Sequence, residues 1–176
     1  MDEIVEAALR KWPDVPDCHG WLALDARGDW YMRDARVQAA GPFPQVKGSR
    51  IAHERLLSFI HRNYAADASG AWFFQNGPQR VYVELEAAPW IWRLQPAGDG
   101  ASATVCAHTG RAAVVESAWQ DERGRLFLHA DIGLGLVHTL DMGIAADALE
   151  AGAWRLREMP FAAMPTHFGF TLRPRP

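Results

Sequence analysis

The sequence predicts an α+β fold with mostly antiparallel β meanders in two small lobes. Short runs of aromatic and β-branched residues recur along the chain, and such residues favour strands. The turns between many of these runs are too short for parallel crossovers, which indicates antiparallel pairing. Helical periodicity is confined mainly to residues 2–12 and 51–64.

Composition is that of an ordinary globular protein. The 176 residues are 49% hydrophobic and 22% charged, with a formal net charge of -3. This length suits one domain, or two small lobes that share a core. No basic field exists for nucleic acid or an anionic membrane, so neither is expected as a partner.

The cysteines and the N-terminal residues indicate a cytoplasmic protein. Cys18 and Cys106 are the only cysteines, and isolated cysteines of this kind are typical of a reducing compartment. The first twelve residues begin with acidic side chains and lack the apolar core of a secretory signal. No run approaches the ~20 apolar residues that span a membrane.

The first lobe is predicted to cover residues 1–95. A helix over residues 2–12 ends at Pro13, and residues 21–32 form a hairpin. Residues 34–50 are rich in Gly and Pro and are expected to be a loop, and residues 51–64 form the second helix.

The densest strand signal lies in residues 71–94. We expect a tight hairpin turn with Asn76 and Gly77 at its two φ > 0 positions. After this turn, apolar residues at 81, 83 and 85 alternate with polar residues at 80, 82, 84 and 86. This alternation predicts a strand with one buried face, and residues 90–94 are expected to continue the same meander.

A boundary between the lobes is predicted near Pro96, in the Gly- and Pro-rich residues 96–101. The second lobe, residues 96–176, then contains strands at 104–108, 112–119, 125–130 and 133–140. Asp147 is a predicted N-cap for a helix at 148–151. Two further strands are expected at 154–157 and 167–172.

An Asp-x-x-Gly turn occurs three times, at residues 25–28, 67–70 and 121–124, and each turn precedes a bulky strand. Three independent turns of common chemistry explain this pattern. A duplicated β unit explains it as well, with the first and third turns forming similar hairpins in the two lobes.

Histidines suggest one candidate metal site. His129 and Asp131 are two residues apart on a predicted strand, and His138 lies on the next segment. Imidazole and carboxylate groups are ligands of Zn²⁺ and other transition metals. A metal-dependent hydrolase that uses His129, Asp131 and His138 is therefore an alternative function, against surface or hydrogen-bonded histidines.

No catalytic residue is assigned from the sequence. The chain contains no nucleophile elbow of the G-x-S-x-G type and no phosphate-binding P-loop. Residues 133–136 lack the third glycine of a dinucleotide-binding fingerprint. Cys106 and His108 could share a strand face, but nothing supplies the third group that orients a catalytic base. The sequence therefore favours a non-enzymatic protein and identifies no cofactor.

A binding surface is the leading functional hypothesis. Polar side chains gather around one turn and one strand face, and aromatic side chains follow on the next strand, a composition typical of recognition surfaces. The candidate ligand-binding residues are Gln75, Asn76, Arg80, Tyr82, Glu84, Trp90 and Trp92. The alternative is that both tryptophans belong to the core.

A resemblance to an uncharacterised family of proteobacterial domains of unknown function is carried by three segments, GWLALDARGDWYMRD, IAHERLLSFIHRNY and DASGAWFFQNGPQRVYVELEAAPWIWRL. It covers about residues 20–95 well and the remainder weakly, through GLVHTLD. The resemblance implies two β-rich lobes, loosely like the small barrels of signalling adaptors, and no established activity. It carries over no catalytic residue.

Together these observations predict a cytoplasmic binding or interaction module for a small ligand or a protein partner. A third interpretation is a homodimer in which exposed strand edges pair across chains.

Overall fold

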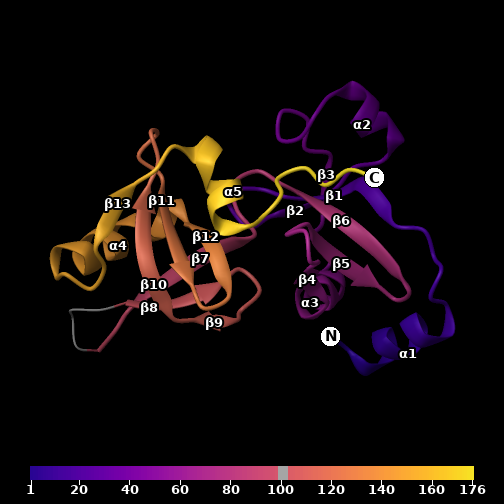
Figure 1. Ribbon diagram of the computed structural model, residues 1–176, viewed down its shortest axis with the longest axis horizontal. Coiled ribbons are helices and arrows are strands. Elements are labelled where there is room, and N and C mark those ends of the chain that lie inside the picture. Colours follow the sequence, from indigo (N-terminus) through magenta and orange to yellow (C-terminus); the bar gives the residue numbers. More distant parts are fainter. Residues whose placement is uncertain (99–102) are drawn as a thin grey trace. The chain divides into compact units, whose positions relative to one another are not determined.

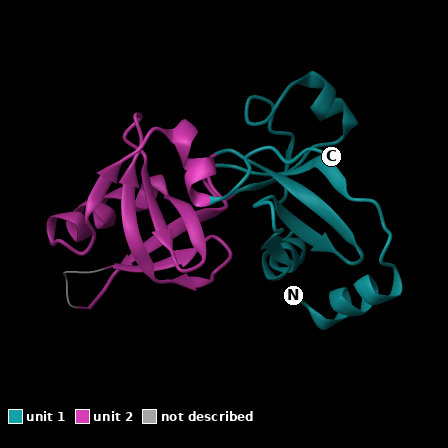
Figure 2. Cartoon of the chain, viewed as in Figure 1, with its two compact units in different colours: residues 1–25, 29–86, 169–176 teal, residues 26–28, 87–168 magenta. Residues whose placement is uncertain are grey.

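The computed structural model describes residues 1–98 and 103–176, which form two compact units (Figure 2). Unit 1 comprises residues 1–25, 29–86 and 169–176, and unit 2 comprises residues 26–28 and 87–168. The predicted α+β class with two mostly antiparallel β-rich lobes is confirmed.

Unit 1 contains one mixed sheet in the order β3-β2-β1-β6-β5-β4 (Figure 1). Its central strands β1 and β6 pair in parallel, and each remaining neighbour pairs antiparallel. The strands are β1 (Cys18–Leu24), β2 (Trp30–Met32), β3 (Ser49–Arg50), β4 (Tyr64–Ala66), β5 (Trp72–Asn76) and β6 (Gln79–Leu85).

Three helices belong to unit 1: α1 (Glu3–Lys11), α2 (Ala35–Ala40) and α3 (Glu54–Arg62). The predicted helix at 51–64 is confirmed, with narrower bounds. Helix α2 lies in the segment expected to be a loop. Its first turn is capped by the Asp34 side chain, which accepts a hydrogen bond from the Val37 N–H and so stabilises the helix.

The core of unit 1 lies where α3 packs against the sheet. Phe59 of α3 meets Phe74 edge-to-face at 5.4 Å, and Ile60 beside it is buried. Tyr64 and Trp30 form a second edge-to-face pair at 5.2 Å. These aromatic pairs join the helix-bearing half of the unit to the β1–β2 hairpin.

Helix α1 is attached to unit 1 mainly by polar contacts at its N-terminus and less by burial of its apolar face. Val5 is its one buried residue, while the side chain of Ile4 is exposed. Asp2 binds Arg62 through its carboxylate, at 3.1 Å, and its N–H donates to the Asn63 side chain. The helix is therefore attached to the end of α3.

The hairpin turn between β5 and β6 differs from the predicted one by one residue. Asn76 pairs with Gln79, so Gly77 and Pro78 occupy the turn. Gly77 has a φ of 58°, whereas no residue other than glycine has a positive φ in the described chain. Gly77 adopts this conformation at low cost because it has no Cβ.

Unit 2 contains a second mixed sheet in the order β13-β10-β11-β12-β7-β8-β9. Strands β7 and β12 pair in parallel at its centre, and β10 pairs in parallel with the edge strand β13. The strands are β7 (Trp90–Pro96), β8 (Ala103–Ala107), β9 (Ala112–Ala113), β10 (Val115–Gln120), β11 (Leu126–Ala130), β12 (Gly133–Val137) and β13 (Leu156–Glu158).

The chain leaves unit 1 after Glu86, before the boundary expected near Pro96. Strand β7 does not continue the meander of β5 and β6, because it pairs with β12 and β8 in the other sheet. Pro96 itself pairs with Ala103, so the expected boundary falls within the antiparallel pair of β7 and β8 and not between the units. Residues 99–102 of that predicted boundary lie outside the described residues.

Helices follow β12 and β13 in unit 2. Asp147 lies inside α4 (Met142–Glu150), not at its start, because a 3-10 turn at Thr139–Asp141 leads directly into the helix. The strand expected at 167–172 is wrong: α5 (Met164–Phe168) includes its first two residues, and the chain returns to unit 1 at Gly169.

Candidate functional site

Trp90 and Trp92 belong to the core of unit 2. Both indole rings are buried and stacked, with ring centroids 6.2 Å apart. The Trp90 Nε1–H donates to the Ile132 carbonyl at 2.7 Å, and the Trp92 Nε1–H donates to the Leu128 carbonyl at 2.8 Å. These two candidate ligand contacts are therefore structural, as the alternative interpretation held.

The three candidate metal ligands serve other contacts. His129 lies 3.2 Å from Glu116, and Asp131 accepts a hydrogen bond from the Val114 N–H. His138 is buried, and its Nδ1 accepts from the Leu140 N–H. In the described part of the chain, no group of three or more His, Cys, Asp or Glu side chains is placed to hold a metal ion.

The five other candidate binding residues lie on β5 and β6 of unit 1. Gln75 is buried, and its side chain donates to the Gly77 carbonyl, so it stabilises the turn. Asn76 is exposed beside that turn. The Arg80 guanidinium lies over the Phe73 ring, 4.9 Å from its centroid.

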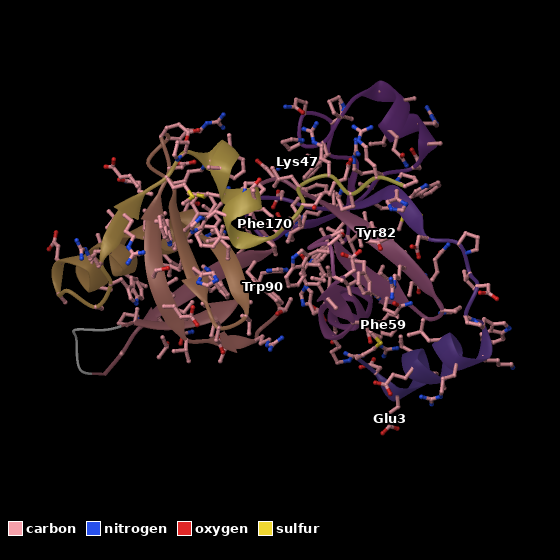
Figure 3. The ribbon with its side chains drawn as sticks, viewed as in Figure 1. Glu3, Lys47, Phe59, Tyr82, Trp90 and Phe170 are labelled. Atoms are coloured by element: carbon pink, nitrogen blue, oxygen red, sulfur yellow. The ribbon has the colours of Figure 1, made fainter. Side chains whose placement is uncertain are left out.

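Tyr82, which Figure 3 labels, lies on β6 beside β1 and belongs to a polar aromatic cluster. The His19 ring stacks on the Tyr82 ring with centroids 4.5 Å apart and an interplanar angle of 13°. The Tyr82 hydroxyl donates to the Asp67 carboxylate at 2.9 Å. This carboxylate also accepts from the Ser69 hydroxyl and from the Ala71 N–H.

These contacts shift two pKa values in opposite directions. Burial raises the pKa of Asp67, but the hydrogen bonds from Ser69, Tyr82 and the backbone outweigh it and hold that pKa below 3.8. Burial and the Asp67 carboxylate raise the pKa of Tyr82 above 10.0. At neutral pH, Asp67 is therefore an ionised carboxylate that accepts a hydrogen bond from the protonated Tyr82 hydroxyl.

Glu84, two residues along β6, forms an ion pair with the buried side chain of Arg33. Arg33 also donates to the Gly41 carbonyl at 2.7 Å and to the Val46 carbonyl at 3.2 Å. The buried guanidinium is consequently satisfied on several sides, and its position is fixed.

The C-terminal segment of unit 1, residues 169–176, completes this face. Figure 1 shows it running to its end beside β1 and β6. The Leu172 carbonyl accepts from the Leu85 N–H at 2.8 Å, and the Thr171 N–H donates to the Gly70 carbonyl at 3.0 Å. Arg173 donates to the Phe43 carbonyl at 2.9 Å. Strand β6 is thus bonded to residues far away in the sequence.

Two cavities of about 280 Å³ each lie on this face. The tyrosine cavity is lined chiefly by Asp17, His19, Asp67, Ser69, Tyr82, Thr171 and Arg175. The arginine cavity is lined by Gly20, Arg33, Gln38, Gly41, Pro42, Glu84, Arg173 and Arg175. The two cavities adjoin, because Arg175 lines both and because Tyr82 and Glu84, one from each cavity, lie on the same face of β6.

A further cavity of about 450 Å³ lies in unit 2, beside the turn at 121–124. Two of its three carboxylates are already used in structural contacts, and the third, that of Glu158, lies on the exposed edge strand β13. Asp121 is bound by the Arg125 guanidinium at 2.7 Å, and Glu122 accepts from the Phe161 N–H at 2.8 Å. The tyrosine and arginine cavities are the better candidate site because they adjoin and because residues from several distant segments line them.

The alternation of polar and apolar residues along β6 predicted Tyr82 and Glu84 as members of this site. It missed His19, Arg33, Asp67 and Arg175, which reach the same face from other segments. No short-range signal identifies them, since the parallel pairing of β1 with β6 brings distant residues together.

A family model described as "Protein of unknown function (DUF2946)" matches residues 1–175. The chain belongs to this family. The resemblance to an uncharacterised family of unknown function is therefore confirmed. No curated protein matches the sequence.

Two solved structures resemble the chain. A DUF1285 family protein from Silicibacter pomeroyi DSS-3 has a TM-score of 0.52 and 14% identity, and the match covers 84% of each chain. A DUF1285 family protein from Shewanella baltica OS155 has a TM-score of 0.48 and 13% identity, over 72% of this chain and 91% of that one. At this identity, the first likeness concerns the fold alone.

None of the helices in the described residues combines the length and the apolar character needed to cross a bilayer.

Proposed function

We propose that unit 1 is a cytoplasmic, non-enzymatic binding module for a small polar ligand. The ligand would occupy the face formed by β1, β6 and residues 169–176. The observation that carries this proposal is the adjoining pair of cavities, lined by residues from several distant segments. Convergence of polar side chains in a concave site is typical of ligand pockets.

The tyrosine cavity would orient the ligand. The stacked rings of His19 and Tyr82 present a flat edge, and the Asp67 carboxylate fixes the Tyr82 hydroxyl. His19 lies half-buried, and no hydrogen bond joins its ring nitrogens to another residue that the structure describes. This imidazole is therefore placed to donate to or accept from a ligand.

A thermal-shift screen with matched variants tests this proposal. Purified protein is compared in the presence of neutral, cationic and anionic small molecules, because a ligand of the folded state raises the unfolding midpoint. Each hit is measured again with His19→Ala and with His167→Ala, which removes an exposed histidine of unit 2. We expect the midpoint rise to be lost in His19→Ala and retained in His167→Ala.

Two results would argue against the site. If no compound in the screen shifts the unfolding midpoint, the result would argue against a small-ligand site in unit 1. A shift that survives in both variants would move the binding surface away from His19.

A further inference from the structure

We infer that the ligand of unit 1 carries an oxyanion, either a carboxylate or a phosphate, which Arg173 and Arg175 bind in the arginine cavity. This inference rests on the proposed function, because it specifies the ligand chemistry of the same site.

The charges that line the arginine cavity do not cancel. Three guanidinium groups, of Arg33, Arg173 and Arg175, face one carboxylate, that of Glu84. Glu84 is already paired with Arg33. In residues 1–98 and 103–176, no carboxylate forms an ion pair with Arg173 or Arg175. Two guanidinium groups without an ion-pair partner therefore remain in a concave site, where an anion is favoured, and Arg175 also borders Asp17 and Asp67 in the adjoining tyrosine cavity.

The position of Arg173 fits this role. One of its terminal nitrogens donates to the Phe43 carbonyl at 2.9 Å, which orients the guanidinium without neutralising it. A guanidinium has five N–H donors, so several remain for a ligand. Its planar fork matches the two oxygens of a carboxylate or phosphate.

The wall behind these two side chains is rigid. Arg33 is held by the Gly41 and Val46 carbonyls and by Glu84, and its side chain is 3% exposed. Gln38 donates to the Arg33 carbonyl at 2.9 Å, which ties α2 to the same wall. An oxyanion would therefore meet a prearranged surface, which lowers the ordering cost of binding.

The direct test is calorimetric titration of the full chain with inorganic phosphate and, separately, with acetate, at ionic strength matched by chloride. The two anions distinguish phosphate from carboxylate recognition. We expect millimolar or tighter binding of at least one anion and about tenfold weaker binding in Arg173→Gln/Arg175→Gln, because charge-assisted hydrogen bonds are lost. The control is Arg155→Gln, which removes an exposed arginine of unit 2.

A second variant tests the sign of the charge effect. Glu84→Gln removes the one carboxylate that lines the cavity, so anion binding should strengthen. Thermal midpoints of all variants, measured without anion, show whether each remains folded. Unchanged or weaker anion binding by a folded Glu84→Gln variant would overturn the inference.

The outcomes separate this inference from the function on which it rests. Binding of a neutral or cationic compound that depends on His19 but not on Arg173 and Arg175 would overturn the oxyanion and retain the site. Anion binding weakened equally by Arg155→Gln would show non-specific attraction and overturn it as well. A protein that binds neither the anions nor any screened compound would remove both proposals.

Discussion

At Gly135, the space beside the backbone is filled by an indole. A Cβ built at this position would lie 2.4 Å from the Trp92 ring and 2.8 Å from the Trp90 Cβ. Real Cβ atoms do not approach other atoms so closely, and the buried rings have no room to move. Gly135 therefore leaves the space beside β12 that the Trp92 indole and the Trp90 Cβ occupy.

Gly135→Ala is accordingly expected to destabilise the protein by about 1–3 kcal/mol, the usual cost of overpacking a core. Chemical denaturation measures this change. Gly143→Ala is the control, since no atom lies within 4 Å of its added Cβ. Equal stabilities of the two variants would show that the indoles can shift.

The same residues show why side-chain facing was only partly predictable. Period-two spacing places Trp90 and Trp92 on one face of a strand. Whether that face is buried depends on Gly135 and on the carbonyls that accept from the indoles, at Leu128 and Ile132. These partners lie far along the chain, so the local pattern does not reveal them.

Among the elements, the Asp-x-x-Gly turns share one geometry. In the turns that begin at Asp25, Asp67 and Asp121, the Asp N–H donates to the carbonyl four residues later. The Asp side chain in turn accepts from the N–H of that later residue. This reciprocal bonding explains why Asp precedes Gly at each turn.

Turn chemistry gives a pH-dependent stability. Burial raises the pKa of Asp121, but the hydrogen bonds from Arg125 and Arg123 outweigh it and hold that pKa below 3.8. Because the folded-state pKa lies below the unfolded value, the carboxylate stabilises the fold above about pH 3.8. The contribution is lost as the pH falls through the folded-state pKa.

Asp121→Asn should therefore lower the free energy of unfolding at pH 7 by about 1–2 kcal/mol, and the difference from wild type should shrink as the pH falls below 3.8. Denaturation curves over this pH range measure the difference. Asp147→Asn, at an exposed residue of α4, should have little effect at any pH. A deficit that does not change with pH would show that ionisation of Asp121 is irrelevant.

The C-terminal segment depends on a glycine in the second of these turns. A Cβ at Gly70 would lie 2.1 Å from the Gly169 carbonyl, whereas Gly77 has open space around it. Both glycines have positive φ, at 79° and 58°, so alanine incurs conformational strain at each. Only at Gly70 does alanine also displace residues 169–172.

Gly70→Ala is thus expected to speed hydrogen exchange at Thr171, whose N–H donates to the Gly70 carbonyl, much more than Gly77→Ala does. Amide exchange followed by mass spectrometry or NMR measures this effect. Similar exchange in both variants would mean that the segment is held independently of Gly70.

For the whole molecule, the two sheets share one strand order. Unit 1 joins the meanders β1-β2-β3 and β4-β5-β6, and unit 2 joins β7-β8-β9 and β10-β11-β12. In each, the first strand pairs in parallel with the last at the centre of the sheet. This correspondence supports the duplicated β unit, but the equivalent turns are those at Asp67 and Asp121. The expected equivalence of the first and third turns is wrong, because the turn at Asp25 joins β1 to β2.

The sequence predicted the class and two lobes because turns and alternation are local signals. The boundary between the units was predicted near Pro96 and lies after Glu86. The prediction differs because a Pro- and Gly-rich sequence is compatible with a hairpin turn as well as with a linker between domains. The sequence also showed no sign that residues 169–176 return to unit 1, where Phe170 and Pro174 are buried. That return creates the candidate site, and it is a long-range event.

Removal of residues 169–176 should consequently destabilise unit 1 more than unit 2. The truncated chain loses the Leu85–Leu172 hydrogen bond and the buried Phe170, and a buried Phe is worth about 1.5–3 kcal/mol. Hydrogen exchange resolved by segment measures this effect. The truncation should accelerate exchange in β1 and β6 more than in β11 and β12. Uniform loss of protection across both sheets would contradict this expectation.

The central claim is that the face formed by β1, β6 and residues 169–176 binds a ligand. The most direct measurement is amide chemical-shift mapping of the full chain against a library of small polar fragments. We expect the shifts to cluster at residues 17–20, 67–71, 82–84 and 171–175, which line the two cavities. Fragments that bind only unit 2, or none that binds at all, would contradict the claim.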